Sequence, residues 1–116
     1  MPHFIIDCSA NILTKVQERE ILKTIFEATF SSGLFEKADI KVRVNPYSRY
    51  EVGGKPTDFI HVFGYILEGR TDKEIADLSQ SIVKPLVDLF PDVEFIASSI
   101  DEFTKIGYSN RNLVAK

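Results

Sequence analysis

The chain has 116 residues, of which 44% are hydrophobic and 27% charged, as expected for one globular domain over residues 1–116. Its formal net charge of −3 argues against nucleic-acid binding, and no apolar run is long enough to span a membrane. The single cysteine, Cys8, excludes an internal disulfide, and Asp7 comes too early for a signal peptide, so we expect a cytoplasmic protein.

The first third of the chain predicts a strand followed by a helix. Residues 3–8 are typical of a short strand, which begins almost at the first residue although chain ends usually fray. Thr14 and Gln17 have the spacing of a capping box, in which two side chains satisfy free backbone N–H groups at a helix start. We expect this helix to end at Ser32-Gly33, because glycine readily adopts the left-handed conformation that closes a helix. Its apolar face would consist of Val16, Ile21, Leu22, Ile25, Phe26 and Phe30.

A second strand and a loop complete the first half. Residues 40–44 alternate apolar and basic side chains, which is the pattern of a half-buried strand. Asn45-Pro46 and Gly53-Gly54 are turn signals, so the residues between them are predicted to form a loop or a hairpin.

The second half repeats this plan. Residues 59–67 predict a strand, and Thr71 and Glu74 have capping-box spacing for a second helix. Pro85 would remove one backbone hydrogen bond inside this helix, and Pro91-Asp92 would end it. Its apolar stripe would consist of Ile75, Leu78, Ile82, Leu86 and Leu89.

The order strand–helix–strand therefore occurs twice. Residues 93–100 predict the last strand, and residues 101–116 predict a tail with short structure. We predict the α/β (α+β) class, with two β-α-β repeats that form a four-stranded sheet and two helices on one face. The other face would be bare although it carries apolar residues, which indicates that a partner subunit covers it.

Pro2 is a candidate general base. If Met1 is removed, Pro2 carries a secondary amine at the chain end, and an α-amino group ordinarily titrates near about pH 7.7–8.0. Burial and nearby cations lower the pKa of an amine, so its neutral form can accept a proton at neutral pH. The plainer alternative is that Pro2 merely follows the translation start. If Met1 stays, the Pro2 nitrogen is an amide and not a base.

Three cations are candidates for binding a carboxylate. Lys41 and Arg43 lie on one face of a predicted strand, and Arg can hold a carboxylate through two hydrogen bonds. Arg70 directly precedes the second predicted helix, whose N-terminus favours anions. The alternative for all three is an ordinary solvated surface residue. His61 is expected in the core or at an interface, and Cys8 is expected to be a small buried residue. No Cys/His cluster has zinc-binding spacing, so no metal site is predicted.

Several segments are similar to one known family when taken together. They are the opening Met-Pro-His-Phe-Ile-Ile-Asp-Cys-Ser-Ala-Asn-Ile, Ser32-Gly33-Leu34-Phe35, Ile40-Lys41-Val42-Arg43-Val44, Phe59-Ile60-His61-Val62, Gly69-Arg70-Thr71, and more weakly Ile100-Asp101-Glu102 and the Tyr108–Leu113 tail. These segments cover most of the chain. They resemble the 5-carboxymethyl-2-hydroxymuconate delta-isomerase family of the tautomerase superfamily, whose members fold as β-α-β repeats and commonly form trimers.

The resemblance implies an isomerase of aromatic-compound catabolism that needs no cofactor. It would convert an unsaturated 2-hydroxy dicarboxylate, a dienol, into its conjugated keto isomer. Pro2 would be the catalytic residue, and Lys41, Arg43 and Arg70 would bind the substrate. Lys41 stands where we expect Arg in the family. The implied partners are a small carboxylate substrate and further copies of the chain in a homotrimer.

Two other functions are compatible with these residues. The first is a tautomerase of another 2-keto acid, which the change to Lys41 favours because Lys lacks the two-pronged carboxylate grip of Arg. The second is a non-enzymatic, trimeric module that binds a small ligand. Such a module would have no need of a free Pro2 amine.

Overall fold

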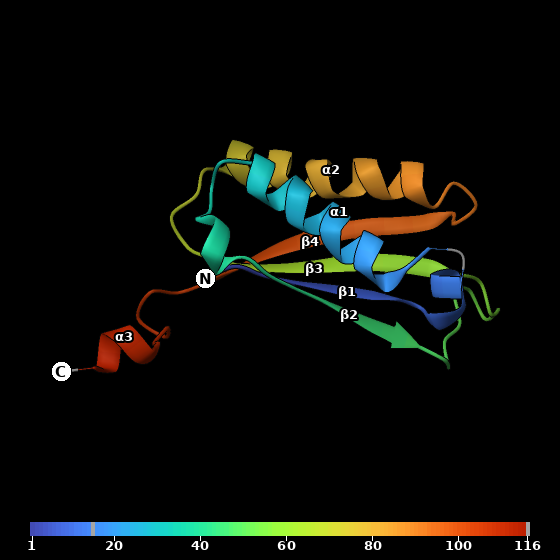
Figure 1. Ribbon diagram of the computed structural model, residues 1–116, viewed down its shortest axis with the longest axis horizontal. Helices are drawn as coiled ribbons and strands as arrows, with labels where there is room; N and C mark the ends of the chain where they lie inside the picture. Colours follow the sequence, from blue (N-terminus) through green and yellow to red (C-terminus); the bar gives the residue numbers. More distant parts are fainter. Residues whose placement is uncertain (15, 116) are drawn as a thin grey trace.

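The computed structural model describes residues 1–14 and 16–115, and these contain a four-stranded sheet built from two β-α-β units (Figure 1). The strands are β1 (His3–Ser9), β2 (Lys41–Tyr47), β3 (Phe59–Leu67) and β4 (Phe95–Phe103). In space they follow the order β2-β1-β3-β4. β1 is parallel to β2 and β3 is parallel to β4, whereas the central pair β1 and β3 is antiparallel. This arrangement confirms the predicted fold class.

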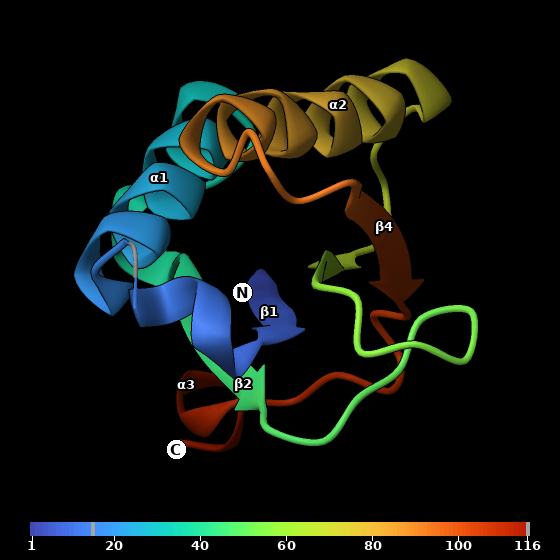
Figure 2. The same cartoon turned by 90° about the vertical axis from the view of Figure 1, so that its right-hand side faces the viewer.

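The helices α1 (Glu18–Ser31) and α2 (Asp72–Leu89) lie on the same face of the sheet (Figure 2). The core between them and the strands is apolar and includes Phe4, Ile6, Ile21, Ile25, Ile60, Val62, Ile66, Leu78, Ile82 and Leu86. Shorter elements are the 3-10 helices η1 (Ala10–Thr14) and η2 (Lys37–Asp39) and the one-turn helix α3 (Arg111–Val114). Within the described residues, no helix is long and apolar enough to cross a membrane.

The start of α2 follows the predicted capping box. The Thr71 hydroxyl accepts a hydrogen bond from the Glu74 N–H at 3.1 Å, and the Glu74 carboxylate accepts one from the Thr71 N–H at 2.9 Å. The bond from the Thr71 backbone holds the pKa of Glu74 below its ordinary value. Pro85 lies inside α2, as predicted. Because the cap fixes the first turn, it also fixes the segment that carries Arg70.

The start of α1 differs from the prediction. α1 begins at Glu18, and Gln17 at the N-cap makes no side-chain capping bond. The Thr14 hydroxyl instead donates to the Asn11 carbonyl at 2.8 Å within η1. A short hydroxyl side chain readily bonds a nearby backbone carbonyl, and here that local bond replaces the predicted cap.

The buried face of α1 is also narrower than the apolar pattern indicated. Phe30 is 45% exposed, whereas Thr29 is fully buried. The Thr29 hydroxyl donates to the Ile25 carbonyl at 2.9 Å, which satisfies its polar atom inside the core. Thr29 therefore occupies the core position that the sequence pattern assigned to an aromatic residue.

Two strands extend beyond their predicted ends. β2 continues through Asn45-Pro46, which the sequence marked as a turn. β2 is an edge strand, where the missing N–H of proline is tolerated. β4 runs over Phe95–Phe103 and not over residues 93–100, because it pairs with β3 along its full length, from Phe59 opposite Phe95 to Leu67 opposite Phe103.

The face of the sheet that α1 and α2 leave bare is rich in aromatic side chains. On β3, alternate residues belong to the core while the residues between them face the other side. His61 stacks on Phe63 there, with ring centroids 4.2 Å apart, and Tyr65 is among the exposed large hydrophobic residues. A bare aromatic face of this kind is typical of a surface that another protein covers.

Gly64 provides a test of how the side chains of neighbouring strands pack in the core. A Cβ atom at this position would lie 2.6 Å from Cδ1 of Ile100 and 2.9 Å from Cε1 of Phe4. We therefore predict that Gly64→Ala lowers the free energy of unfolding in urea by about 1–3 kcal/mol through overpacking. Gly107→Ala, outside the sheet, should change it by less than about 0.5 kcal/mol. Equal stabilities of the two variants would contradict this packing.

Candidate functional site

Pro2 is buried at the point where the chain enters β1. Its carbonyl accepts a hydrogen bond from the Lys41 N–H at 3.1 Å, which extends the pairing of β1 with β2 by one residue. A cavity of about 160 Å³ lies beside it, lined by Met1, Pro2, Leu34, Phe35, Glu36, Asp39, Leu67 and Arg70. The backbone bond holds Pro2 in one position in the wall of this cavity.

Arg70 reaches the same cavity from the other β-α-β unit. Its Nη2 donates to the Leu34 carbonyl at 2.7 Å, and its guanidinium carbon lies 5.4 Å from the centre of the Phe35 ring. These contacts combine a charge-assisted hydrogen bond with a cation–π interaction, so the guanidinium is positioned before any ligand binds. A guanidinium has several N–H donors, and those not used by Leu34 can take a carboxylate.

Met1 is present in this structure, so the Pro2 nitrogen is an amide nitrogen and the α-amine belongs to Met1. That amine lies 3.8 Å from a carboxylate oxygen of Asp39. Burial lowers the pKa of the Met1 amine most strongly, the Asp39 charge opposes this shift, and the Lys41 charge adds to it. The surroundings of the N-terminus therefore disfavour a protonated amine on balance.

Lys41 and Arg43 are exposed on the bare face of the sheet, and neither lines this cavity, although Lys41 contacts Asp39 in its wall. Val42 and Val44 pack against the core, and the basic side chains between them are exposed. The Lys41 Nζ donates to the Asp39 carbonyl at 2.8 Å. Of the four residues that the sequence proposed for the site, the structure thus brings Pro2 and Arg70 together, whereas Arg43 points to the other side.

Arg43 belongs to a second hollow, of about 410 Å³, lined by His3, Arg43, Tyr65, Phe103, Gly107 and Tyr108. The Nη1 atom of Arg43 lies 3.1 Å from Nδ1 of His3. Since a guanidinium only donates, Nδ1 accepts, and the neutral ring carries its proton on Nε2. Burial, then the charges of Arg43 and Lys41, lower the pKa of His3, which favours this neutral ring.

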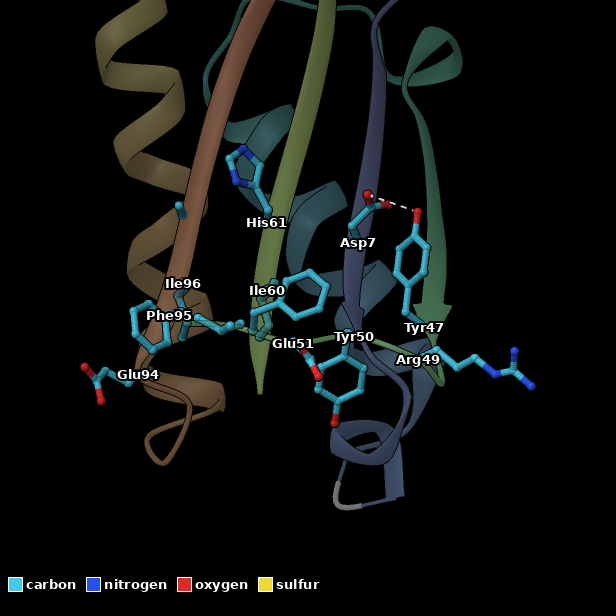
Figure 3. Close-up of a pocket in the computed structure, with 13 residues that line it drawn as sticks. Asp7, Tyr47, Arg49, Tyr50, Glu51, Ile60, His61, Glu94, Phe95 and Ile96 are labelled. Atoms are coloured by element: carbon cyan, nitrogen blue, oxygen red, sulfur yellow. Dashed lines mark hydrogen bonds between the residues drawn. The ribbon is translucent and has the colours of Figure 1, made fainter. Parts of the chain in front are cut away.

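A hollow of about 610 Å³ lies on the bare face at the other end of the sheet; we call it the sheet hollow (Figure 3). Aromatic side chains line much of it, together with Asp7, whose carboxylate accepts from the Tyr47 hydroxyl at 3.4 Å. Arg49 lies at its rim and points away from the sheet (Figure 3). Because β1 and β2 are parallel, Arg49 after β2 is at the opposite end from Pro2 before β1.

Cys8 and His61 are not free reactive groups. Cys8 is fully buried, as predicted, and burial, followed by the charges of Asp7 and Glu18, raises the pKa of its thiol to about 11. A thiol with this pKa is a poor nucleophile at neutral pH. The Nε2 atom of His61 lies 2.9 Å from the Ser99 hydroxyl on the half-buried bare face. His61 therefore lies outside the core, and its other expected place, at an interface, stays a prediction.

The sequence reasoning missed most of the cavity wall. Phe35 could have been predicted, because an aromatic residue between a helix-ending glycine, Gly33, and the next strand is expected to pack over the turn. Tyr108 had none. It stacks on Phe103 with ring centroids 5.3 Å apart, and its hydroxyl contacts the Met1 sulfur from far along the chain. Contacts of that kind depend on where the tail leaves the sheet.

Two β-α-β units that share one four-stranded sheet, with both helices on one face, define a tautomerase-like fold. The model of the 5-carboxymethyl-2-hydroxymuconate isomerase family matches residues 2–100, and the chain belongs to this family. Membership supports an isomerase or tautomerase activity. No curated protein matches the chain.

Solved structures share the fold at low sequence identity. Pt0534 inactivated by 2-oxo-3-pentynoate has a TM-score of 0.84 at 15% identity, covering 97% of this chain and 94% of that one. A 5-carboxymethyl-2-hydroxymuconate isomerase from Deinococcus radiodurans R1 has a TM-score of 0.83 at 20% identity, and the match covers 95% of this chain and 88% of that one. Wild-type fused 4-OT, an asymmetric trimer, has a TM-score of 0.81 at 10% identity, and the match covers 94% of this chain and 92% of that one. These identities establish similarity of fold alone.

The contact between Arg43 and His3 gives a prediction that NMR can check. In a proton titration, the pKa of His3 should lie below its ordinary value, and Arg43→Ala should raise it by removing the nearest cation. Lys41→Ala serves as a control and should raise the pKa less, because its charge contributes less. An unchanged His3 pKa in Arg43→Ala would contradict the described contact.

Proposed function

We propose that this protein is an isomerase that moves a proton on a small unsaturated 2-hydroxy carboxylate or dicarboxylate, with the Pro2 amine as the base. The observation that carries the proposal is that Pro2 and Arg70 line one cavity of about 160 Å³. A proton acceptor and a carboxylate-binding cation side by side are what such a reaction requires. Family membership supports the reaction class.

The base must first be uncovered by removal of Met1. Pro2 is then the terminal residue, and its secondary amine occupies a position one residue deeper than the amine of Met1. Burial already lowers the pKa of the Met1 amine at the less buried position. The Pro2 amine, at a more buried position and in the wall of the cavity that Arg70 also lines, is therefore expected to be neutral over a wider pH range than an exposed amine.

In the proposed reaction, neutral Pro2 takes the proton of the 2-hydroxyl group or of an acidic C–H. The electron pair left behind is delocalised over the diene as a dienolate, and the protonated Pro2 returns the proton to a different carbon. Arg70 binds a carboxylate and stabilises the negative charge as it forms. The proton is conserved and no electrons are gained or lost, so the reaction itself calls for no cofactor.

We infer that Lys41 and Arg43 act at the boundary between copies of the chain. Both are exposed on the bare face and neither lines the cavity, although the Lys41 Nζ bonds the carbonyl of Asp39 in its wall. From this face, Arg43 would reach a substrate where a second copy brings its own cavity alongside. A homotrimer supplies such boundaries, and fused 4-OT, which shares the fold, is a trimer. Lys41 and Arg43 would then bind the far end of the substrate.

A second candidate substrate class is a simpler 2-keto acid. Lys41 stands where we expect Arg in the family, and its ammonium group cannot form the paired hydrogen bonds of a guanidinium. A substrate with a single carboxylate, held by Arg70, would not need a second carboxylate-binding guanidinium at position 41. Pt0534, which shares the fold, is inactivated by 2-oxo-3-pentynoate, itself a 2-keto acid.

The pH dependence of activity tests the base. With protein lacking Met1, a panel of 2-hydroxydienoates followed by ultraviolet absorbance should give a kcat/KM that rises with pH through one ionisation. Because the neutral amine is the active form and its pKa is lowered, this rise should be complete at a lower pH than for an exposed proline amine.

The matched control for this measurement is a variant with one serine inserted before Pro2, which turns the Pro2 amine into an amide. We expect it to lose activity without losing stability. Full activity in this variant would exclude Pro2 as the base. Binding of these substrates without turnover by protein lacking Met1 would favour the small-ligand-binding module.

Removal of the Arg70 side chain should affect chemistry more than folding. We predict that Arg70→Ala lowers kcat/KM by about 2–4 kcal/mol of transition-state stabilisation. Arg19→Ala on the exposed face of α1 is the matched control and should leave kcat/KM unchanged. Because Arg70 also braces Leu34, urea unfolding of both variants should accompany the kinetics. A kcat/KM equal to that of the parent would remove Arg70 from the proposed site.

A further inference from the structure

Residues 104–115, which we call the C-terminal arm, project away from the body of the protein. They follow β4 and carry α3, which lies beyond the end of the sheet that holds the N-terminus (Figure 1). The radius of gyration is 15.3 Å, against about 13 Å for a compact chain of this length. The principal extents of 50 × 27 × 26 Å show the same elongation.

The arm carries apolar side chains that its own chain does not bury. Ile106 is 96% exposed, Leu113 60% and Val114 67%. α3 is a single turn, capped by Asn110, whose carboxamide oxygen accepts from the Leu113 N–H at 2.9 Å. A single turn with an unburied apolar side is not stable by itself in water. We therefore expect another surface to cover the exposed apolar side chains of the arm.

The root of the arm is nonetheless anchored. The Lys105 N–H donates to the Glu68 carboxylate at 2.6 Å, and Tyr108 stacks on Phe103 at the end of β4. These contacts set the direction in which the arm leaves the sheet. The arm is also basic, since residues 104–115 contain Lys105 and Arg111 and no acidic residue.

The sheet hollow has the complementary character. Its walls include the aromatic rings of Tyr47, Tyr50, Phe59 and Phe95. Among its lining residues, the carboxylates of Asp7, Glu51 and Glu94 outnumber the guanidinium of Arg49. Phe95 is among the exposed large hydrophobic residues. At about 610 Å³, the hollow has room for several side chains. An aromatic floor with an excess of carboxylates fits a short segment that is apolar and basic.

We propose that the C-terminal arm of one copy docks in the sheet hollow of a second copy. Leu113 and Val114 would cover the aromatic rings, and Arg111 would lie near the carboxylates. The arm starts at the end of β4 and the hollow lies at its beginning, about 26 Å away along the strand. Because the arm points away from its own hollow, the receiving hollow belongs to a neighbour.

Docking of this kind is head-to-tail, since it joins unlike surfaces of identical chains. Such contacts close into a ring when the rotation between copies allows it. The arm root lies beside the N-terminus, where Tyr108 contacts Met1. A docked arm therefore brings the neighbour's sheet end close to the Pro2 cavity. The inference rests on the proposed association of copies and not on the chemistry of Pro2.

Photocrosslinking tests the docking directly. Leu113 is replaced by p-benzoylphenylalanine, and chains labelled with ¹⁴N and ¹⁵N are mixed so that cross-links between copies are distinguished by mass. We expect cross-links between different chains that map to residues 47–52 or 94–97. The same photo-reactive residue at Val87, an exposed apolar position on α2, is the control and should not reach these segments.

Sedimentation of point variants provides the second readout. Leu113→Asp together with Val114→Asp, and separately Phe95→Asp, should each raise the dissociation constant of the assembly at least about tenfold. Val87→Asp should leave it unchanged. A parent protein that is monomeric at micromolar concentration would overturn the proposed assembly. An assembled protein whose Leu113 cross-links stay within one chain or map to the helices would overturn the docking alone, and neither result would affect the test of Pro2 as the base.

Discussion

The backbone hydrogen bond from the Lys41 N–H to the Pro2 carbonyl is the constraint on which the proposed site depends. Chain ends ordinarily fray, and a mobile amine would have neither a fixed position nor a stable environment. Here β1 is a central strand, paired with β2 on one side and β3 on the other. The bond extends that pairing to the second residue. The end of the chain thereby becomes part of the wall of a cavity.

The separation of the sheet into a covered and a bare face explains why the cations fall into two groups. Arg70 comes from the β3–α2 connection and reaches the covered side, where Leu34 and Phe35 hold it. Lys41 and Arg43 alternate with core valines and so emerge on the bare side. In the proposed assembly, the bare face of one copy meets the cavity of the next. Association and catalysis would then share one boundary.

Local signals in the sequence predicted the fold well, and non-local contacts limited the rest. Thr71 and Glu74 form the predicted capping box because both partners lie within one helical turn. Thr14 had an equally good spacing but bonds the Asn11 carbonyl, a competing partner that the pattern does not reveal. The ends of β4 follow from its pairing with β3 and not from its own residues.

The same limit applies to the candidate site. Alternation predicted that Lys41 and Arg43 share a face, but not that Arg70 and Pro2 lie on the other side. That difference depends on how two β-α-β units join across the antiparallel pair β1 and β3. The C-terminal arm was predicted only as a tail with short structure. Its direction is set by the contacts of Lys105 and Tyr108 with residues distant in sequence.

The most direct measurement of the central claim is a ¹⁵N NMR titration of protein that lacks Met1 and is labelled in its five prolines. Only a terminal proline has an amine that titrates, because the nitrogen of an internal proline is an amide. The account predicts one titrating proline signal, with a pKa below that of an exposed proline amine. A terminal proline whose pKa equals or exceeds the exposed value would contradict the proposal that the fold prepares Pro2 as a neutral base.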